Sequence, residues 1–192
     1  MFGVGSRHVA MATVVGSVAV LAGCGGSGGV SASSYMASAC KSLGTWESTV
    51  KSQEQRTETE LPSVLAQAAN GGSAVLTRAK TLLVTFTTDL VTATKTVQKG
   101  LDAAGTPNVK NGSQITAKLH DAFGSALSIL ETDLSHVEKI STSSASAFES
   151  EATTLERSIQ SAFGSFQGAA PNSPELNAAG KKVPACVALG FT

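Results

Sequence analysis

The stretch SAVLTRAKTLLVTFTTDLVTATKTVQKGL, residues 73–101, decides the fold class of this chain. It is rich in β-branched residues, and residues 82–87 alone are compatible with a strand. Over the whole stretch, however, apolar residues recur at steps of three and four with no turn signal between them, which is the period of an amphipathic helix. These residues are Val75, Ala79, Leu82, Phe86, Leu90, Ala93, Val97 and Leu101. The stretch predicts one long helix, with Ser73 as its N-cap and an end before Gly105 and Pro107.

A second helical pattern precedes this stretch, from Met36 to about residues 58–60. Its apolar face comprises Met36, Cys40, Leu43, Trp46 or Thr45, and Val50. Pro62 disfavours helix in the residue before it and fits the first turn of a new helix. We therefore expect a break at Pro62 and a short helix over 63–69, which the Asn-Gly-Gly turn at 70–72 ends.

Two more helical patterns follow, and Ser113 is expected to cap the first of them. The apolar positions of this first pattern are Ile115, Leu119, Ala122 or Phe123, Leu127, Leu130, Leu134, Val137 and Ile140 or Ser141. The serine-rich run 141–144 is expected to be a loop. The next pattern comprises Phe148, Ala152, Leu155, Ile159, Phe163 and Phe166. Near the end of the chain, Ser173-Pro174-Glu175 is typical of the start of a small helix, and Gly180 should end it.

Amphipathic helices joined by short connections predict an all-α fold. We expect an antiparallel bundle of about four long helices that occupies residues 35–192 as a single domain. Charged residues are balanced, with 14 Lys plus Arg and 14 Asp plus Glu. This balance gives no basic footprint, so no nucleic-acid partner is expected.

The first residues, 1–23, have the features of a secretory signal. Arg7 precedes the apolar run 9–21, which is too short for a comfortable membrane span. The run ends in Leu21-Ala22-Gly23-Cys24, which resembles the lipobox of bacterial lipoproteins at all four positions. The resemblance implies cleavage before Cys24 and attachment of a diacylglycerol, with fatty acids such as palmitate, to its sulfur. An ordinary thiol at the end of an uncleaved helix is the alternative.

The glycine- and serine-rich segment 24–34 is then the lipidated cysteine followed by a flexible tether. Gly23-x-Gly25-x-x-Gly28 also fits a dinucleotide-binding pattern, and Gly25-x-Ser27-x-Gly29 fits the nucleophile elbow of hydrolases. Both patterns require a preceding strand and a following helix, which the sequence does not offer here. The expected location is the cell membrane, with the protein anchored by lipid on its extracytoplasmic face.

Cys40 and Cys186 remain once Cys24 is assigned to the lipid. In an exported protein an even pair of cysteines predicts a disulfide, which here would close the C-terminal tail onto the first helix. Two separate buried thiols are the alternative. The layout resembles that of a type of exported helical protein of actinobacteria, with an early cysteine, a bundle rich in serine, alanine and leucine, and a late cysteine. That resemblance carries no functional residues.

Two groups of ionisable residues are candidates for a functional site. Asp133 and His136 have the i, i+3 spacing of metal ligands in helical bundles, but a di-iron site needs two such motifs. We interpret them as a surface ion pair or as solvated residues, and expect no metal and no other cofactor. The densest acidic group, Glu54, Glu58 and Glu60, lies beside Arg56 and is interpreted as a solvated face. No catalytic residue is expected, so the protein is not expected to be an enzyme.

Two further patterns leave alternatives open. Phe123, Phe148, Phe163 and Phe166 are either core residues or the lining of an apolar cavity between helices. A stripe of threonines is either a neutral surface or close helix contact, or else a docking face or a set of sites for O-linked sugars. Its members are Thr77, Thr81, Thr85, Thr88, Thr92 and Thr96.

The functional expectation is a membrane-anchored lipoprotein of the cell envelope that acts as a non-enzymatic interaction or scaffolding module. Its partners would be the membrane, through the lipid, and an envelope protein. The alternative is a carrier that holds a lipid or other apolar small molecule between its helices. A third option is an enzyme with a dispersed site.

Overall fold

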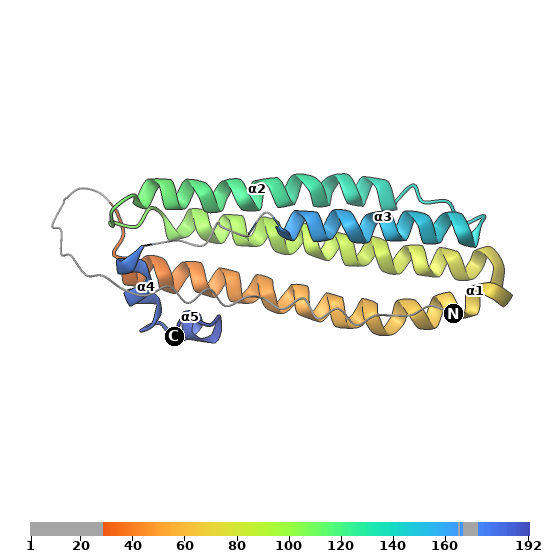
Figure 1. Cartoon of the computed structure of the whole chain (residues 1–192), viewed down its shortest axis with the longest axis horizontal. Coiled ribbons are helices and arrows are strands. Elements are labelled where there is room, and N and C mark those ends of the chain that lie inside the picture. Colours follow the sequence, from red (N-terminus) through yellow and green to blue (C-terminus); the bar gives the residue numbers. More distant parts are fainter. Residues whose placement is uncertain (1–28, 165, 167–172) are drawn as a thin grey trace.

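A computed structural model describes residues 29–164, 166 and 173–192 of the chain. In this part the chain is helical and forms no β-sheet, so the predicted all-α class is confirmed (Figure 1). The helices in order are α1 (Ala32–Ala104), α2 (Gly112–Val137), α3 (Ala145–Gly164), α4 (Pro174–Gly180) and α5 (Pro184–Ala188).

Helix α1 folds back on itself at Gly72. This glycine has φ 58° and ψ −152°, a conformation that glycine adopts without steric penalty and other residues avoid. The fold-back divides α1 into an outgoing arm, residues 32–71, and an antiparallel return arm, residues 73–104 (Figure 1). The quoted stretch 73–101 is therefore helical throughout, as predicted, and does not contain a strand.

Pro62 does not break the outgoing arm, so the predicted break and the separate short helix over 63–69 are wrong. The proline ring lies on the exposed face of the arm, where water can solvate the carbonyl that lacks its helical partner. Val64 is buried, and Leu61 and Leu65 pack partly against the same core. Burial of these three side chains offsets the roughly 3 kcal/mol that an interior proline costs.

The four long helical segments run antiparallel to their neighbours in sequence (Figure 1). Helix α2 packs against α1, and α3 packs against α2. The connection 138–144 contains the loop predicted at 141–144. The predicted cap at Ser113 is wrong, because α2 begins at Gly112 and Asn111 is its N-cap with φ 61°. Asparagine tolerates this left-handed conformation better than most residues. Ser173 is the N-cap of the small C-terminal helix α4, as predicted, since its hydroxyl accepts a hydrogen bond from the Leu176 amide.

The buried face of the return arm is wider than the predicted stripe and is rotated from it in places. Val75, Leu82, Phe86 and Ala93 of the predicted stripe are only half-buried. The return arm packs against both the outgoing arm and α2, and so buries the side chains between two faces of the helix. The buried residues are Leu76, Ala79, Leu83, Thr87, Leu90, Val91, Thr94, Val97 and Leu101.

The rod-shaped bundle has two ends that differ in structure (Figure 1). We call the end where α1 begins and α4 and α5 gather the basal end, and the end with Gly72 and the connection 138–144 the distal end. The outgoing arm spans about 60 Å between them at 1.5 Å per residue. Gly100 lets the two arms approach near the basal end, because a Cβ atom there would lie 2.1 Å from Ser42 Oγ.

Candidate functional site

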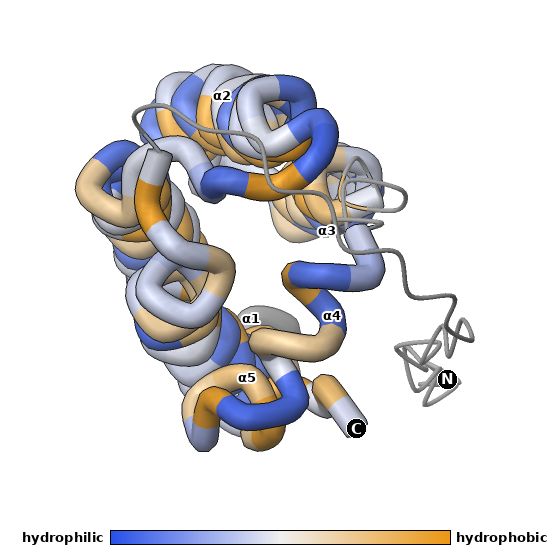
Figure 2. Tube along the Cα trace, turned by 90° about the vertical axis from the view of Figure 1, so that its left-hand side faces the viewer, coloured by the Kyte–Doolittle hydropathy of each residue, from blue (hydrophilic) through white to orange (hydrophobic). Residues whose placement is uncertain are grey.

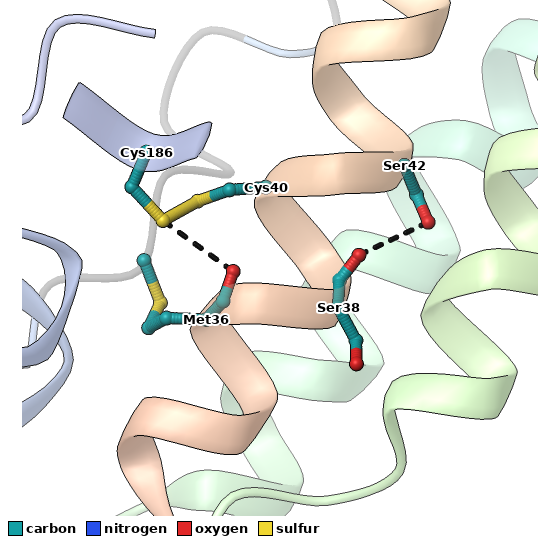
Figure 3. Close-up of a disulfide and its surroundings, with 5 residues drawn as sticks. All are labelled: Met36, Ser38, Cys40, Ser42 and Cys186. Atoms are coloured by element: carbon teal, nitrogen blue, oxygen red, sulfur yellow. Dashed lines mark hydrogen bonds between the residues drawn. A yellow bond between two sulfur atoms is a disulfide. The ribbon is translucent and has the colours of Figure 1, made fainter. Parts of the chain in front are cut away.

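Cys40 and Cys186 form the predicted disulfide, with Cα atoms 5.0 Å apart (Figure 3). Both residues are buried, and the bridge fastens α5 to the basal end of the outgoing arm. The Met36 carbonyl oxygen lies 3.4 Å from Cys186 Sγ. A disulfide sulfur carries no hydrogen, so this approach is a sulfur–oxygen contact and not a hydrogen bond.

Residues 1–23 and Cys24 lie outside the described residues, so the signal peptide and the lipid attachment remain predictions. Of the predicted tether 24–34, residues 32–34 already belong to α1, and Ser31 is its N-cap. Two backbone hydrogen bonds hold Val30 to the connection between α1 and α2. The Val30 amide donates to Thr106 at 2.9 Å, and the Asn108 amide donates to Val30 at 2.8 Å. The chain therefore enters the bundle at a fixed point of the basal end.

Three of the four phenylalanines proposed as a cavity lining lie together around Trp46. The Trp46 ring centroid is 5.5 Å from that of Phe123, 5.7 Å from Phe163 and 5.2 Å from Phe166, with the rings edge to face. Phe148 lies apart from them, fully buried near the start of α3 in the distal part of the core. Trp46 comes from the outgoing arm, Phe123 from α2, Phe163 from the end of α3, and Phe166 from the turn that follows α3. The cluster is a layer of rings packed on one another.

The two best-formed hollows in the described part of the bundle are not lined by those phenylalanines. The larger has a volume of about 310 Å³ and opens on the surface near the distal end. Its lining is Thr77, Lys80, Thr81, Val84, Thr85 and Thr142. The Lys80 ammonium donates a hydrogen bond to the Ile140 carbonyl at 3.0 Å, which ties the connection 138–144 to the return arm. The smaller hollow, about 10 Å³, has room for about one water molecule.

The threonine stripe of the return arm faces mainly outward. Of its six members, Thr85 is half-buried and the others are exposed. The hydroxyls of Thr77, Thr81 and Thr96 donate to carbonyls four residues earlier, so their oxygens offer lone pairs to the surroundings. Thr77, Thr81 and Thr85 form one wall of the larger hollow. Sequence reasoning missed the two buried threonines of this arm, Thr87 and Thr94, because it followed only apolar side chains.

Asp133 and His136 were predicted to form a surface ion pair or to be solvated, and only His136 lies at the surface. His136 Nε2 lies 2.6 Å from Glu151 Oε2 of α3, which is a surface ion pair when the histidine is protonated. Asp133 is not solvated but buried, because α3 covers that face of α2. Burial raises the pKa of Asp133, and a hydrogen bond from Ser158 and the charge of His136 lower it less. No set of three or more potential ligands suited to a metal occurs within the described residues.

The acidic group on the outgoing arm is solvated, as predicted. Glu54 and Glu58 are exposed, and Arg56 Nε lies 2.9 Å from Glu60 Oε1. Shielding from water and then the negative charge of Glu58 raise the pKa of Glu54, whereas Lys51 lowers it. These carboxylates lie on a convex helix surface and not in a cleft.

Charge is distributed unevenly along the rod. The basal half, taken as residues 29–45, 95–122 and 173–192, has seven lysines and three acidic residues. The distal half, residues 46–94 and 123–164, has six basic and eleven acidic residues. The basal half therefore carries a net charge of plus four and the distal half of minus five at neutral pH. The balanced total concealed this separation, because the helices run back and forth between the two ends.

No protein-family model, curated protein or solved structure matches this chain. Among the described helices, none combines the length and the apolarity needed to cross a bilayer. The fold defines a class, a disulfide-closed antiparallel helical bundle.

Proposed function

We propose that this protein is a lipid-anchored, non-enzymatic interaction module of the cell envelope, held on the extracytoplasmic face of the membrane. The lipobox-like residues 21–24 support the anchor. The observation that carries the proposal is the pair of backbone hydrogen bonds that hold Val30 to Thr106 and Asn108. These bonds attach the segment that follows the predicted anchor to the basal end of the bundle. A module of this kind raises the effective concentration of its outer surface toward envelope partners.

The distal end is the part of the rod that the proposal assigns to a protein partner. The distal half carries the acidic surplus of the chain, and the 310 Å³ hollow near the distal end is lined in part by Lys80 and Thr142. A partner with a basic surface complements the acidic distal half electrostatically, which speeds encounter and selects against acidic competitors. The disulfide and the aromatic layer around Trp46 hold the rod together below it.

A carrier of lipid or other apolar small molecules is the second candidate, and the aromatic cluster is the observation in its favour. Phe163 and Phe166 are only half-buried and lie beside Trp46. An apolar ligand would have to enter between rings that now contact one another.

The anchor is tested by the intact mass of the non-reduced protein, extracted gently from bacterial membranes. We expect a chain that starts at Cys24, heavier by acyl groups and lighter by two hydrogens for the Cys40–Cys186 bridge. An unmodified chain that starts at Met1 would overturn the proposal. A further apolar mass that is lost on denaturation would favour the carrier.

The interaction role is tested by a photo-reactive residue placed at Thr142 or Thr81 in the full chain in living cells. We expect cross-links to one defined envelope protein from these distal positions. The same residue placed at Ser113 or Lys118, which are exposed near the basal end, serves as the control and should not give that product. Equal capture from both ends would contradict a distal docking surface.

A further inference from the structure

The basal end of the bundle is constrained to lie close to the residue that the proposed function assigns to the membrane. Five peptide links separate Cys24 from Gly29, and a fully extended chain spans at most about 3.6 Å per residue. Cys24 can therefore lie no more than about 18 Å from Gly29. The bonds from Val30 to Thr106 and Asn108 fix Gly29 beside the connection 105–111.

The side chains exposed at this end suit an anionic surface. Lys110 lies in the connection between α1 and α2, and Lys181 and Lys182 follow α4. All three are exposed, and none lies within 4.0 Å of a carboxylate oxygen in the described part of the chain. The hydrogen bond from Ser173 and, to a smaller extent, the charge of Lys110 nevertheless lower the pKa of Glu175. Each lysine near an anionic bilayer strengthens binding by about fivefold.

The acidic residues of the basal half offset these lysines only in part. They are Asp102, Asp121 and Glu175. Asp102 Oδ1 lies 3.4 Å from His120 Nε2, and Glu175 accepts a hydrogen bond from the Ser173 hydroxyl at 2.7 Å. The net charge of the basal half thus stays at plus four, next to a distal half of minus five.

Apolar exposure is concentrated at the same end. Val30, with 37% of its surface exposed, and Val187, with 47%, are the large apolar residues exposed within the described residues. Val30 belongs to the entry segment, and Val187 lies on α5 beside the disulfide. Figure 2 looks onto this end, where α4 and α5 gather around the start of α1.

We propose that the basal surface, formed by Val30, Lys110, Lys181, Lys182 and Val187, binds the headgroups of anionic lipids and directs the acidic distal half away from the membrane. The inference rests on the proposed anchor, and it adds a second membrane contact to it. Acyl chains combined with a basic patch give more lasting attachment than one chain alone. Repulsion between anionic headgroups and the distal carboxylates favours the same orientation.

The test uses the mature acylated protein reconstituted into vesicles of phosphatidylcholine alone or with 30% phosphatidylglycerol. Amide hydrogen exchange is measured in segments 108–111 and 181–183 at the basal end and in 138–144 at the distal end. We expect exchange at the basal segments to slow at least threefold when phosphatidylglycerol is present, and to recover in 0.5 M salt. Exchange at the distal segment should not change.

Two matched triple variants test whether these lysines cause the response of basal exchange to phosphatidylglycerol. Lys110→Gln, Lys181→Gln and Lys182→Gln together should abolish the dependence on phosphatidylglycerol. Arg78→Gln, Lys139→Gln and Arg157→Gln remove the same charge from exposed sites of the distal half and should preserve it. Equal loss in both triples, or basal exchange that does not respond to phosphatidylglycerol, would overturn the inference.

Failure of the anchor and failure of the basal surface give different results. If the protein floats with both kinds of vesicle but exchange ignores lipid charge, the anchor stands and the inference falls. The full chain with Cys24→Ser tests the surface without the lipid. It should float weakly with vesicles that contain phosphatidylglycerol and not with vesicles of phosphatidylcholine alone. Equal flotation with the two kinds of vesicle, or none with either, would contradict a lipid-binding surface.

Discussion

Trp46 and Thr94 lie 48 residues apart on opposite arms of α1, and the indole Nε1 donates a hydrogen bond to Thr94 Oγ1 at 3.2 Å. Thr94 is completely buried, and the Trp46 ring contacts Phe123, Phe163 and Phe166 on its other sides. The bond therefore joins the two arms at the level where α2 and the end of α3 meet them. It satisfies the one polar atom of an otherwise apolar layer of rings.

Replacing Thr94 by valine should destabilise the bundle by about 1–3 kcal/mol, because the partly buried indole N–H loses its acceptor. Trp46 is the only tryptophan, so urea unfolding followed by its fluorescence measures the loss. Thr96→Val is the matched control: Thr96 is exposed, and its change should stay within about 0.5 kcal/mol. Equal effects of the two variants would mean that the bond contributes nothing specific.

Replacing Gly72 by alanine should lower the free energy of unfolding by about 1–3 kcal/mol, since φ is 58° there. No atom lies within 4 Å of the added Cβ, so the loss reports backbone strain alone. Gly124→Ala, in the interior of α2, has only an ordinary contact at 3.8 Å with Gln98 and should stabilise the protein by about 0.5–1 kcal/mol. Thermal unfolding of both variants tests the pair. A Gly72→Ala protein as stable as the original would show that the fold-back does not need this conformation.

Replacing both Cys40 and Cys186 by alanine should reduce stability by about 2–5 kcal/mol. Closing a loop between residues 146 apart in sequence gives about 5 kcal/mol in the chain-entropy description, which is an upper figure. Hydrogen exchange should rise most in α5, whose covalent link to α1 is lost. Cys24→Ser serves as the control and should leave the melting temperature unchanged. A double variant that melts with the original protein would contradict a stabilising role for the bridge.

Replacing Asp133 by asparagine should raise stability at pH 7 by roughly 1 kcal/mol, because it removes a buried charge whose Oδ2 has no hydrogen-bond partner in the described structure. The folded pKa of Asp133 lies above its usual value of 3.8, so the folded state binds the proton more tightly than the unfolded state. Its contribution to stability is therefore complete below about pH 3.8 and is lost as the pH rises through the folded pKa.

Urea midpoints measured from pH 3 to pH 8 test this pH dependence. The asparagine variant should lack the decline that Asp133 causes as the pH rises. Glu131→Gln, an exposed site on the same helix, should retain that decline and change stability by less than about 0.5 kcal/mol. If the urea midpoint of Asp133→Asn fell with rising pH as it does in the original protein, the decline would belong to another ionisable group.

The sequence predicted the helices well where a local signal was strong. The period of residues 73–101, the loop at 141–144 and the Ser173 cap all follow from residues near one another in the chain. The disulfide followed from an even pair of cysteines. The break at Pro62 was predicted wrongly, because the local preference of proline was outweighed by burial of Val64 against residues far away in sequence.

The sequence by itself determined the all-α class, the approximate helix limits and the pairing of Cys40 with Cys186, since these depend on periodicity, turn residues and cysteine count. Only the tertiary structure decided that Asp133 is buried, that Trp46 reaches Thr94, and that lysines predominate in one half of the rod and carboxylates in the other. Each of these features depends on which helix faces cover one another, and residues brought together from different helices leave no spacing pattern in the chain.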